Sequence, residues 1–333
     1  MSLALSVLDL SPVGAGVAPS QAVRDSIELA IEADRLGYTR YWFAEHHNMA
    51  TIATSAPEVL IAAAGARTTR IRLGAGGIMV PNHSPLHVVE MFRTLEALYP
   101  GRIDLGLGRA PGTDPVTSAA LRRGQDAEVN TLLAELLAFE DNEFPERHPF
   151  AQIVPQPSDV SCEAIWMLGS TLAGATIAAQ LGVHYAFAGH FAMRHAKEAI
   201  AHYRRSFSPS RRLDRPYAIC AVTVICGADD ADAQRLAAPV RVAIANTRTG
   251  KSLPIPTIEE ALAHEFTPQE QAIVDEFMVG AVIGGPETVR SKLIAVAREI
   301  GADEIMLSSL VPGHETRKQA LARIARAFDQ PRA

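Results

Sequence analysis

Eight short apolar runs alternate with longer segments of helical periodicity along almost the whole chain. The runs cover residues 3–10, 40–44, 71–80, 102–108, 164–169, 183–188, 217–226 and 303–310. Near-continuous apolar strands are typical of parallel sheets, because helices cover both faces of such a sheet. Eight strand–helix units in 333 residues, with no low-complexity linker between them, predict one α/β domain over residues 1–333, folded as a closed (β/α)8 TIM barrel.

The competing arrangement is an open, doubly wound sheet. That fold is expected to carry a G-x-G-x-x-G phosphate-binding turn after its first strand. The turn here reads SPVGAGVAPS, and Pro19 occupies the position of the third glycine. The sequence therefore favours the closed barrel.

The alternation is interrupted once, between the seventh and eighth strands. Residues 241–285 contain a polar stretch with several prolines, TRTGKSLPIPTIEEALAHEF. Long segments without a clear pattern are commonly functional loops or active-site lids. We interpret residues 241–285 as an insertion that forms a lid beside the mouth of the barrel.

Composition and charge exclude several classes of partner. The net charge of −6, without any run of Lys or Arg, argues against nucleic-acid binding. No apolar run approaches the roughly 18 residues of a membrane span, and the apolar start of the chain lacks the basic region of a signal peptide. Cys162, Cys220 and Cys226 form no C-x-x-C pair, which is typical of reduced thiols in a cytoplasmic protein.

Unusual motifs fall at the ends of five predicted strands. In a TIM barrel the active site lies at the carboxyl ends of the strands. Strands two to six run into AEHHN, GGIMVPNHSP, GLGRAPG, LGSTLAGAT and AFAGHF. We therefore expect these motifs, which are far apart in sequence, to meet at one rim of the barrel.

His46 and His47 are adjacent in the first of these motifs. Neighbours on an extended strand point to opposite faces, so we expect one to face the cavity and the other to pack outward against a loop. The cavity-facing histidine is a candidate general base or hydrogen-bond donor. The alternative is two structural histidines. The consecutive Glu45, His46 and His47 lack H-x-H or H-E-x-x-H spacing, so we predict no metal site.

Glycines interrupt the third strand at positions 74, 76 and 77. A glycine inside a strand marks a bulge or a place where a ligand approaches the backbone. We favour a flat ligand here, and a corner of the barrel is the alternative.

Arg109 directly follows the fourth strand, and its guanidinium suits a phosphate or carboxylate. Ser170 and Thr171 precede a predicted helix, whose free N–H groups and neighbouring hydroxyls can bind an anion. The alternatives are a surface ion pair for Arg109 and an ordinary helix cap for the hydroxyls. Because the fourth and fifth strands are neighbours, both groups could hold one phosphate. We assign no role to His83, to His190 or to the cysteines.

Five stretches together resemble the bacterial luciferase-like flavin-dependent monooxygenases, and in particular their uncharacterised FMN-type oxidoreductase branch. They are YWFAEHH, RLGAGGIMVPNHSPLHVVE, LYPGRIDLGLGRAPG, WMLGSTLAGATIAAQLGVHYAFA and VGAVIGGPETVRSKL. The resemblance implies a barrel that binds FMN reduced by a separate flavin reductase. It implies that reduced FMN and O2 form a C4a-hydroperoxyflavin, which oxidises a small organic substrate. It also implies a homodimer.

The resemblance carries over to individual residues. It implies that His46 faces the flavin as the catalytic residue, and that a non-proline cis peptide at Gly76-Gly77 lies behind the isoalloxazine ring. The implied phosphate-binding residues are Arg109, Ser170, Thr171, Gly174 and Ala175. Three alternatives remain open: the deazaflavin F420 as cofactor, a non-catalytic flavin-binding barrel, and a metal-dependent barrel hydrolase that uses the adjacent histidines.

Overall fold

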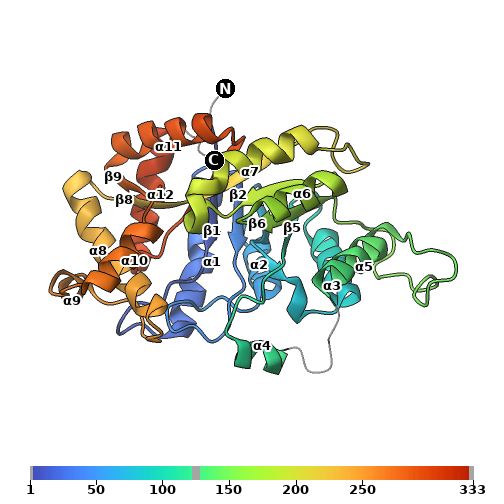
Figure 1. The fold of residues 1–333 in the computed structure, drawn as a ribbon, viewed down its shortest axis with the longest axis horizontal. Coiled ribbons are helices and arrows are strands. Elements are labelled where there is room, and N and C mark those ends of the chain that lie inside the picture. Colours follow the sequence, from blue (N-terminus) through green and yellow to red (C-terminus); the bar gives the residue numbers. More distant parts are fainter. Residues whose placement is uncertain (1–2, 122–127, 330–333) are drawn as a thin grey trace.

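The computed structural model describes residues 3–121 and 128–329, and its elements are drawn in Figure 1. The strands are β1 (Ala4–Asp9), β2 (Arg40–Phe43), β3 (Arg72–Ala75), β4 (Ile78–Met79), β5 (Ile103–Gly108), β6 (Ala164–Gly169), β7 (His184–Phe187), β8 (Ala218–Cys226), β9 (Val282–Gly284) and β10 (Glu304–Ser308). The α-helices are α1 (Pro19–Arg35), α2 (Pro57–Gly65), α3 (Pro85–Leu98), α4 (Pro115–Leu121), α5 (Val129–Asp141), α6 (Leu172–Leu181), α7 (Gly189–Ser206), α8 (Asp230–Arg248), α9 (Ile258–Leu262), α10 (Pro268–Phe277), α11 (Pro286–Ile300) and α12 (His314–Ala327).

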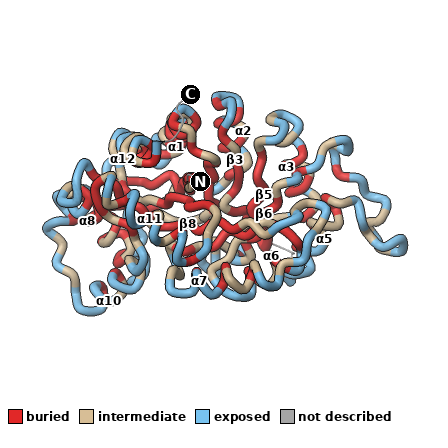
Figure 2. Tube along the Cα trace, turned by 90° about the horizontal axis from the view of Figure 1, so that it is seen from above, coloured by how far each residue is buried: buried red, intermediate tan, exposed pale blue. Residues whose placement is uncertain are grey.

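Eight parallel strands close into a barrel. Their order is β10-β1-β2-β3-β5-β6-β7-β8, and a further parallel pairing of β10 with β8 closes the ring. Helices surround the strands, and buried positions concentrate on the strands in the middle of the molecule (Figure 2). The predicted (β/α)8 TIM barrel is confirmed. Among the described residues, no helix combines the length and the apolar composition that crossing a bilayer requires.

Two predicted elements differ in detail from the structure. The third strand, expected over 71–80, is divided into β3 and β4, and the peptide bond between Gly76 and Gly77 in the gap is cis. The helix expected over 115–140 corresponds to α4 and α5, and residues 122–127 between them lie outside the described part of the chain.

The segment between the seventh and eighth barrel strands is largely regular. Residue 241 falls inside α8, which continues to Arg248 because its buried positions, such as Val240, Ala243 and Ala245, keep a helical spacing. After α9 and α10, β9 pairs with the end of β8. Figure 1 shows α8, α9 and α10 grouped on one side of the barrel.

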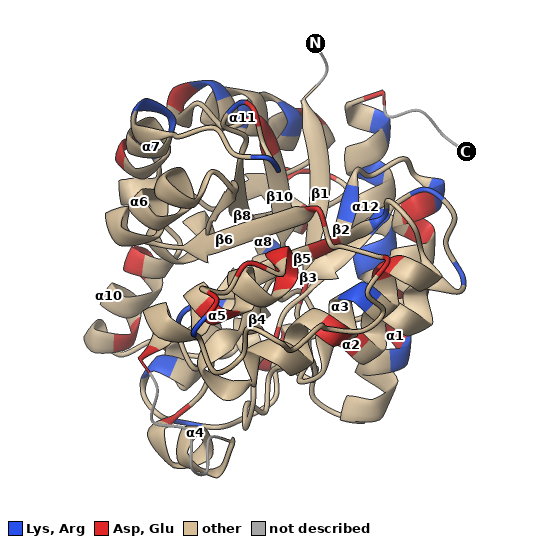
Figure 3. Ribbon diagram, turned by 90° about the vertical axis from the view of Figure 1, so that its right-hand side faces the viewer, with Lys and Arg blue, Asp and Glu red and all other residues tan. Residues whose placement is uncertain are grey.

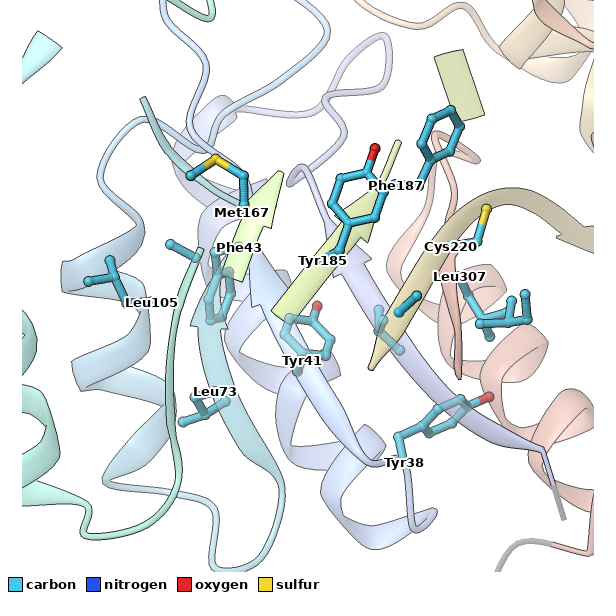
Figure 4. Close-up of a cluster of buried hydrophobic side chains, with 14 of the residues drawn as sticks. Tyr38, Tyr41, Phe43, Leu73, Leu105, Met167, Tyr185, Phe187, Cys220 and Leu307 are labelled. Carbon is cyan, nitrogen blue, oxygen red and sulfur yellow. The ribbon is translucent and has the colours of Figure 1, made fainter. Parts of the chain in front are cut away.

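Alternate residues of the strands belong to two different cores. Tyr41 and Phe43 lie in the large cluster between the strands and the helices, shown in Figure 4. Trp42 and Ala44 lie in a second cluster with side chains of β1, β6, β7, β8 and β10. Because side chains alternate between the two faces of a strand, Trp42 and Ala44 lie inside the barrel.

A buried polar network occupies the interior of the barrel near the amino ends of the strands. The Arg40 guanidinium contacts Asp104 Oδ2 and Glu304 Oε1, both at 2.9 Å. Arg72 donates to Asp104 Oδ1 at 2.8 Å, and the Tyr217 hydroxyl donates to Glu304 Oε2 at 2.8 Å. Figure 3 shows charged residues along the outer helices, such as α11 and α12, whereas the strands carry few. Because this network lies at the amino ends of the strands, it is at the opposite end of the barrel from the rim where the site is predicted.

Candidate functional site

A pocket of about 990 Å³, including its open mouth, lies at the carboxyl ends of the barrel strands. Ligand pockets are typically about 300–1,000 Å³ and mostly apolar, with a few polar groups that orient the ligand. Apolar side chains such as Trp42, Leu168 and Met306 line this pocket. Five of the predicted site residues line it as well: His46, Gly76, Arg109, Ser170 and Thr171.

His46 lies just after β2 and lines the pocket. Its backbone amide donates to the Thr54 carbonyl at 2.9 Å, which fixes the loop. Its ring Nδ1 is buried and has no hydrogen-bond partner among the described residues. Burial lowers the pKa of His46 to about 4, although Glu45 acts in the opposite direction. His46 is therefore a neutral imidazole at pH 7, with one ring nitrogen free to bind a ligand.

We expect an NMR titration to place the midpoint of His46 near pH 4, with the H46A variant used to assign the signal. An unfolded histidine protonates near pH 6.5, about the usual value. The native state binds fewer protons than the unfolded chain between these values, so this group lowers stability as pH falls below about 6.5. H46A should lose that part of the acid sensitivity. A midpoint near pH 6.5 in the native protein would contradict the assignment.

Glu45, which precedes His46, anchors the loop from the other side. Its carboxylate is fully buried and lies 2.9 Å from His83 Nε2 and 3.0 Å from His47 Nε2, and it accepts a hydrogen bond from the Met79 amide at 2.7 Å. Burial would raise the pKa of Glu45, but the hydrogen bonds from His83, His47 and Met79 outweigh it, so its pKa is lowered. The ionised carboxylate ties the loop after β2 to the segment after β4.

The two histidines of the pair have separate environments, as the alternation predicted. His46 lines the pocket, and His47 contacts Glu45 instead. Within residues 3–121 and 128–329, no three His, Cys, Asp or Glu side chains are arranged to hold a metal ion. His83, which has no predicted role, supports the site through Glu45. Its position in the PNHS motif after the third predicted strand could have indicated a role at the site, but the sequence does not show that Glu45 is its partner.

Arg109 and the start of α6 form a polar end of the pocket. Arg109 Nε is buried without a hydrogen-bond partner, and no carboxylate among the described residues pairs with this side chain. Ser170 and Thr171 follow β6, the neighbour of β5 in the barrel. Thr171 is the N-cap of α6, and its side chain makes no capping hydrogen bond. A cationic guanidinium beside an uncapped helix N-terminus fits the phosphate of a nucleotide cofactor.

Gly174 and Ala175 do not line the pocket. A Cβ on Gly174 would lie 3.2 Å from Gly169 Cα, so a larger residue would push the start of α6 away from β6. Ala175 is fully buried. These two residues bring the helix N-terminus close to the end of β6.

The cis peptide implied by the family resemblance is present between Gly76 and Gly77. A Cβ on Gly76 would lie 2.7 Å from Leu8 Cδ1, and one on Gly77 would lie 2.8 Å from the Gly106 carbonyl oxygen. Packing against backbone therefore requires glycine at position 77, whereas a side chain at position 76 would have to displace the end of Leu8. Gly76 lines the pocket and Gly77 does not, so contact between these residues and a flat ligand stays a prediction.

A second compartment adjoins the first and has a volume of about 1230 Å³, including its opening. Both compartments are lined by Leu10, His46, His190 and Phe191, and side chains of α8 and α10 line the second. His190 Nδ1 is buried and unpaired among the described residues, and burial lowers the pKa of His190 to about 4. Sequence reasoning gave His190 no role, although the GHF motif after the sixth strand marked its place.

Comparison with known proteins identifies the family. A family model described as luciferase-like monooxygenase matches residues 3–304. A luciferase-like monooxygenase of Escherichia coli (strain K12) is 40% identical over 304 residues, which cover 90% of this chain and 90% of the relative. The chain belongs to the luciferase-like monooxygenase family. The crystal structure of apo-MsnO8 matches with a TM-score of 0.91 at 36% identity, covering 100% of this chain and 99% of that one.

Two more distant structures of the same fold have different cofactors. The oxygenating constituent of 3,6-diketocamphane monooxygenase from Pseudomonas putida, in complex with FMN, has a TM-score of 0.71 at 20% identity and covers 98% of this chain and 97% of that one. An F420-dependent secondary alcohol dehydrogenase has a TM-score of 0.69 at 15% identity and covers 98% of this chain and 99% of that one. At these identities the likeness shows the fold alone. The predicted membership in the luciferase-like monooxygenase family is confirmed.

Proposed function

We propose that this protein is a monooxygenase that uses reduced FMN, supplied by a separate flavin reductase, and O2 to oxidise a small, largely apolar organic molecule. One observation carries the proposal. A single pocket joins an anion-binding end, at Arg109 and the start of α6, to the buried neutral imidazole of His46, and it opens into a mostly apolar second compartment. Such a shape suits a flat phosphorylated cofactor with a substrate beside it.

Each predicted residue has a task in this proposal. The cofactor phosphate would be held by Arg109, Ser170 and Thr171, and by the α6 N-terminus that Gly174 and Ala175 position. Gly76 and Gly77 would lie along the flavin ring. When bound, reduced FMN supplies the two electrons that activate O2. The neutral His46 would accept or donate a proton at the flavin edge, where the surrounding apolar residues exclude water.

The proposal is tested by anaerobic titration with photoreduced FMN, followed by rapid mixing with oxygen. We expect saturable binding and an oxygen-dependent absorbance phase that precedes the appearance of oxidised flavin. A non-catalytic flavin-binding barrel would be favoured if FMN bound without that absorbance phase and if added substrate did not decrease the amount of peroxide released. Binding of F420 instead of FMN would favour the F420-dependent alternative. Stoichiometric zinc in the purified protein would revive the hydrolase hypothesis.

Replacing Arg109 with glutamine should weaken FMN binding by about 10- to 100-fold, because a charge-assisted contact to the phosphate is lost. Riboflavin, which lacks the phosphate, should bind the wild type and R109Q equally well. Fluorescence titration with both flavins measures the difference. The matched control is R235Q, since Arg235 lies on the surface in an ion pair with Asp232. An equal loss of riboflavin binding would contradict the phosphate assignment.

We also propose a cytoplasmic homodimer that pairs through α2 and α3. Val59 on α2 and Leu98 on α3 are exposed by 62% and 58% respectively, which supports an apolar contact on this side of the barrel. Light scattering on the purified protein measures the oligomeric state, and a monomer at all concentrations would reject this assembly.

A further inference from the structure

The second compartment contains one unusual group for a mostly apolar wall. Arg248, the last residue of α8, lines it together with Val240, Ile244 and Phe277. The Arg248 guanidinium lies over the Phe277 ring, with its Cζ 4.0 Å from the ring centroid. Stacking on an aromatic face fixes the plane of a guanidinium and leaves its N–H edge available.

Arg248 has no counterion in the described part of the chain. It makes neither an ion pair nor a side-chain hydrogen bond there, and Glu276, the charge that acts on it most, lies beyond ion-pair distance. Partial burial lowers the pKa of Arg248. The side chain is otherwise exposed at the wall of the second compartment, so an anionic ligand there can reach the N–H edge of the guanidinium.

The flavin phosphate does not explain this charge. Arg109 lies in the first compartment, beside the α6 N-terminus, whereas Arg248 lies only in the second. The two arginines thus serve different compartments, which meet at His46, His190 and Phe191. Thr247, next to Arg248, lines the second compartment as well.

We propose that the second compartment binds a substrate with an apolar body and a carboxylate end, and that Arg248 holds the carboxylate while the apolar body reaches toward His46. This inference rests on the proposed function, because it names the substrate class of the same site. The planar edge of the guanidinium matches a carboxylate with two parallel hydrogen bonds, which a neutral amide or ester cannot reproduce.

Calorimetric titration with matched probes tests the proposal. The probes are hexanoate, octanoate, decanoate and phenylbutanoate, each compared with its own primary amide, and the titrations are made with saturating oxidised FMN so that the phosphate site is filled. We expect at least one carboxylate to bind the wild type about 10- to 100-fold more tightly than its amide. R248Q should lose that preference, R248K should keep part of it, and the surface variant R235Q should keep all of it.

Two results would overturn the proposal: no carboxylate preference in the wild type, or the same preference in R248Q. FMN affinity is measured separately in every variant, and R248Q should bind FMN like the wild type. If the wild type fails to bind FMN, the proposed function fails. The same probe titrations without FMN then still decide whether Arg248 selects carboxylates.

Discussion

Replacing His46 with alanine is expected to lower kcat by about 100- to 10,000-fold and to change the FMN dissociation constant by less than about tenfold. His46 is the histidine of the pair that lines the pocket, and its neutral ring has a buried nitrogen without a partner among the described residues. Such a group can move a proton during the reaction but adds little to the binding of a cofactor that is held by its phosphate.

His47 offers the matched comparison, because its ring contacts Glu45 and does not line the pocket. We expect H47A to reduce kcat far less than H46A does. Stopped-flow turnover and fluorescence titration measure kcat and FMN affinity on the same samples. Equal losses of turnover and FMN binding in H46A would show that His46 only shapes the pocket, and the catalytic assignment would be wrong.

Replacing Asp104 with asparagine is expected to lower the free energy of unfolding by about 3–5 kcal/mol. Asp104 is fully buried and accepts hydrogen bonds from Arg40 at 2.9 Å, from Arg72 at 2.8 Å and from Trp42 Nε1 at 2.9 Å. An asparagine keeps the size of the side chain but removes the charge that the two guanidiniums face. Arg40 is buried as well, and in D104N it would keep Glu304 as its only carboxylate partner among the described residues.

Urea unfolding of wild type and D104N measures this effect, and E32Q is the matched control. Glu32 pairs with Arg35 on the surface of α1, so its loss should cost less than about 0.5 kcal/mol. Burial would raise the pKa of Asp104, but the charges of Arg40 and Arg72 outweigh burial, so the pKa is lowered. The stabilisation is therefore present above the unfolded-state pKa of about 3.9 and is lost as pH falls through the lower native value. A wild-type advantage that disappeared already near pH 6 would contradict this account.

The sequence predicted the barrel and the place of its site because both depend on local periodicity. Runs of apolar residues alternate with helical segments, and the ends of parallel strands must meet at one rim. From this alone we could place one histidine of the pair, Arg109, Ser170 and Thr171 at one rim, and the family resemblance selected His46. The structure brings these four residues together in one pocket. The different environments of His46 and His47 followed from the alternation of side chains along an extended chain.

The sequence missed residues whose roles depend on a distant partner. Glu45 and His83 are 38 positions apart, and only folding brings the carboxylate and the imidazole together. His190 looked like a loop residue until α7 placed it beside His46 between the two compartments. Residues 241–285 are predicted to be an insertion that forms a lid; the first of them complete α8, and their role as a lid stays a prediction.

The sequence by itself determined the succession of strands and helices, the closed barrel and the rim at which the candidate site lies, since these follow from hydrophobic period and chain order. Only the tertiary structure decided which polar groups are paired and which are not. Glu45 has four hydrogen-bond partners, whereas Arg109 Nε and His46 Nδ1 have none among the described residues. The physical reason is that burial and hydrogen bonding depend on atoms from segments far apart in the chain, which no local pattern records.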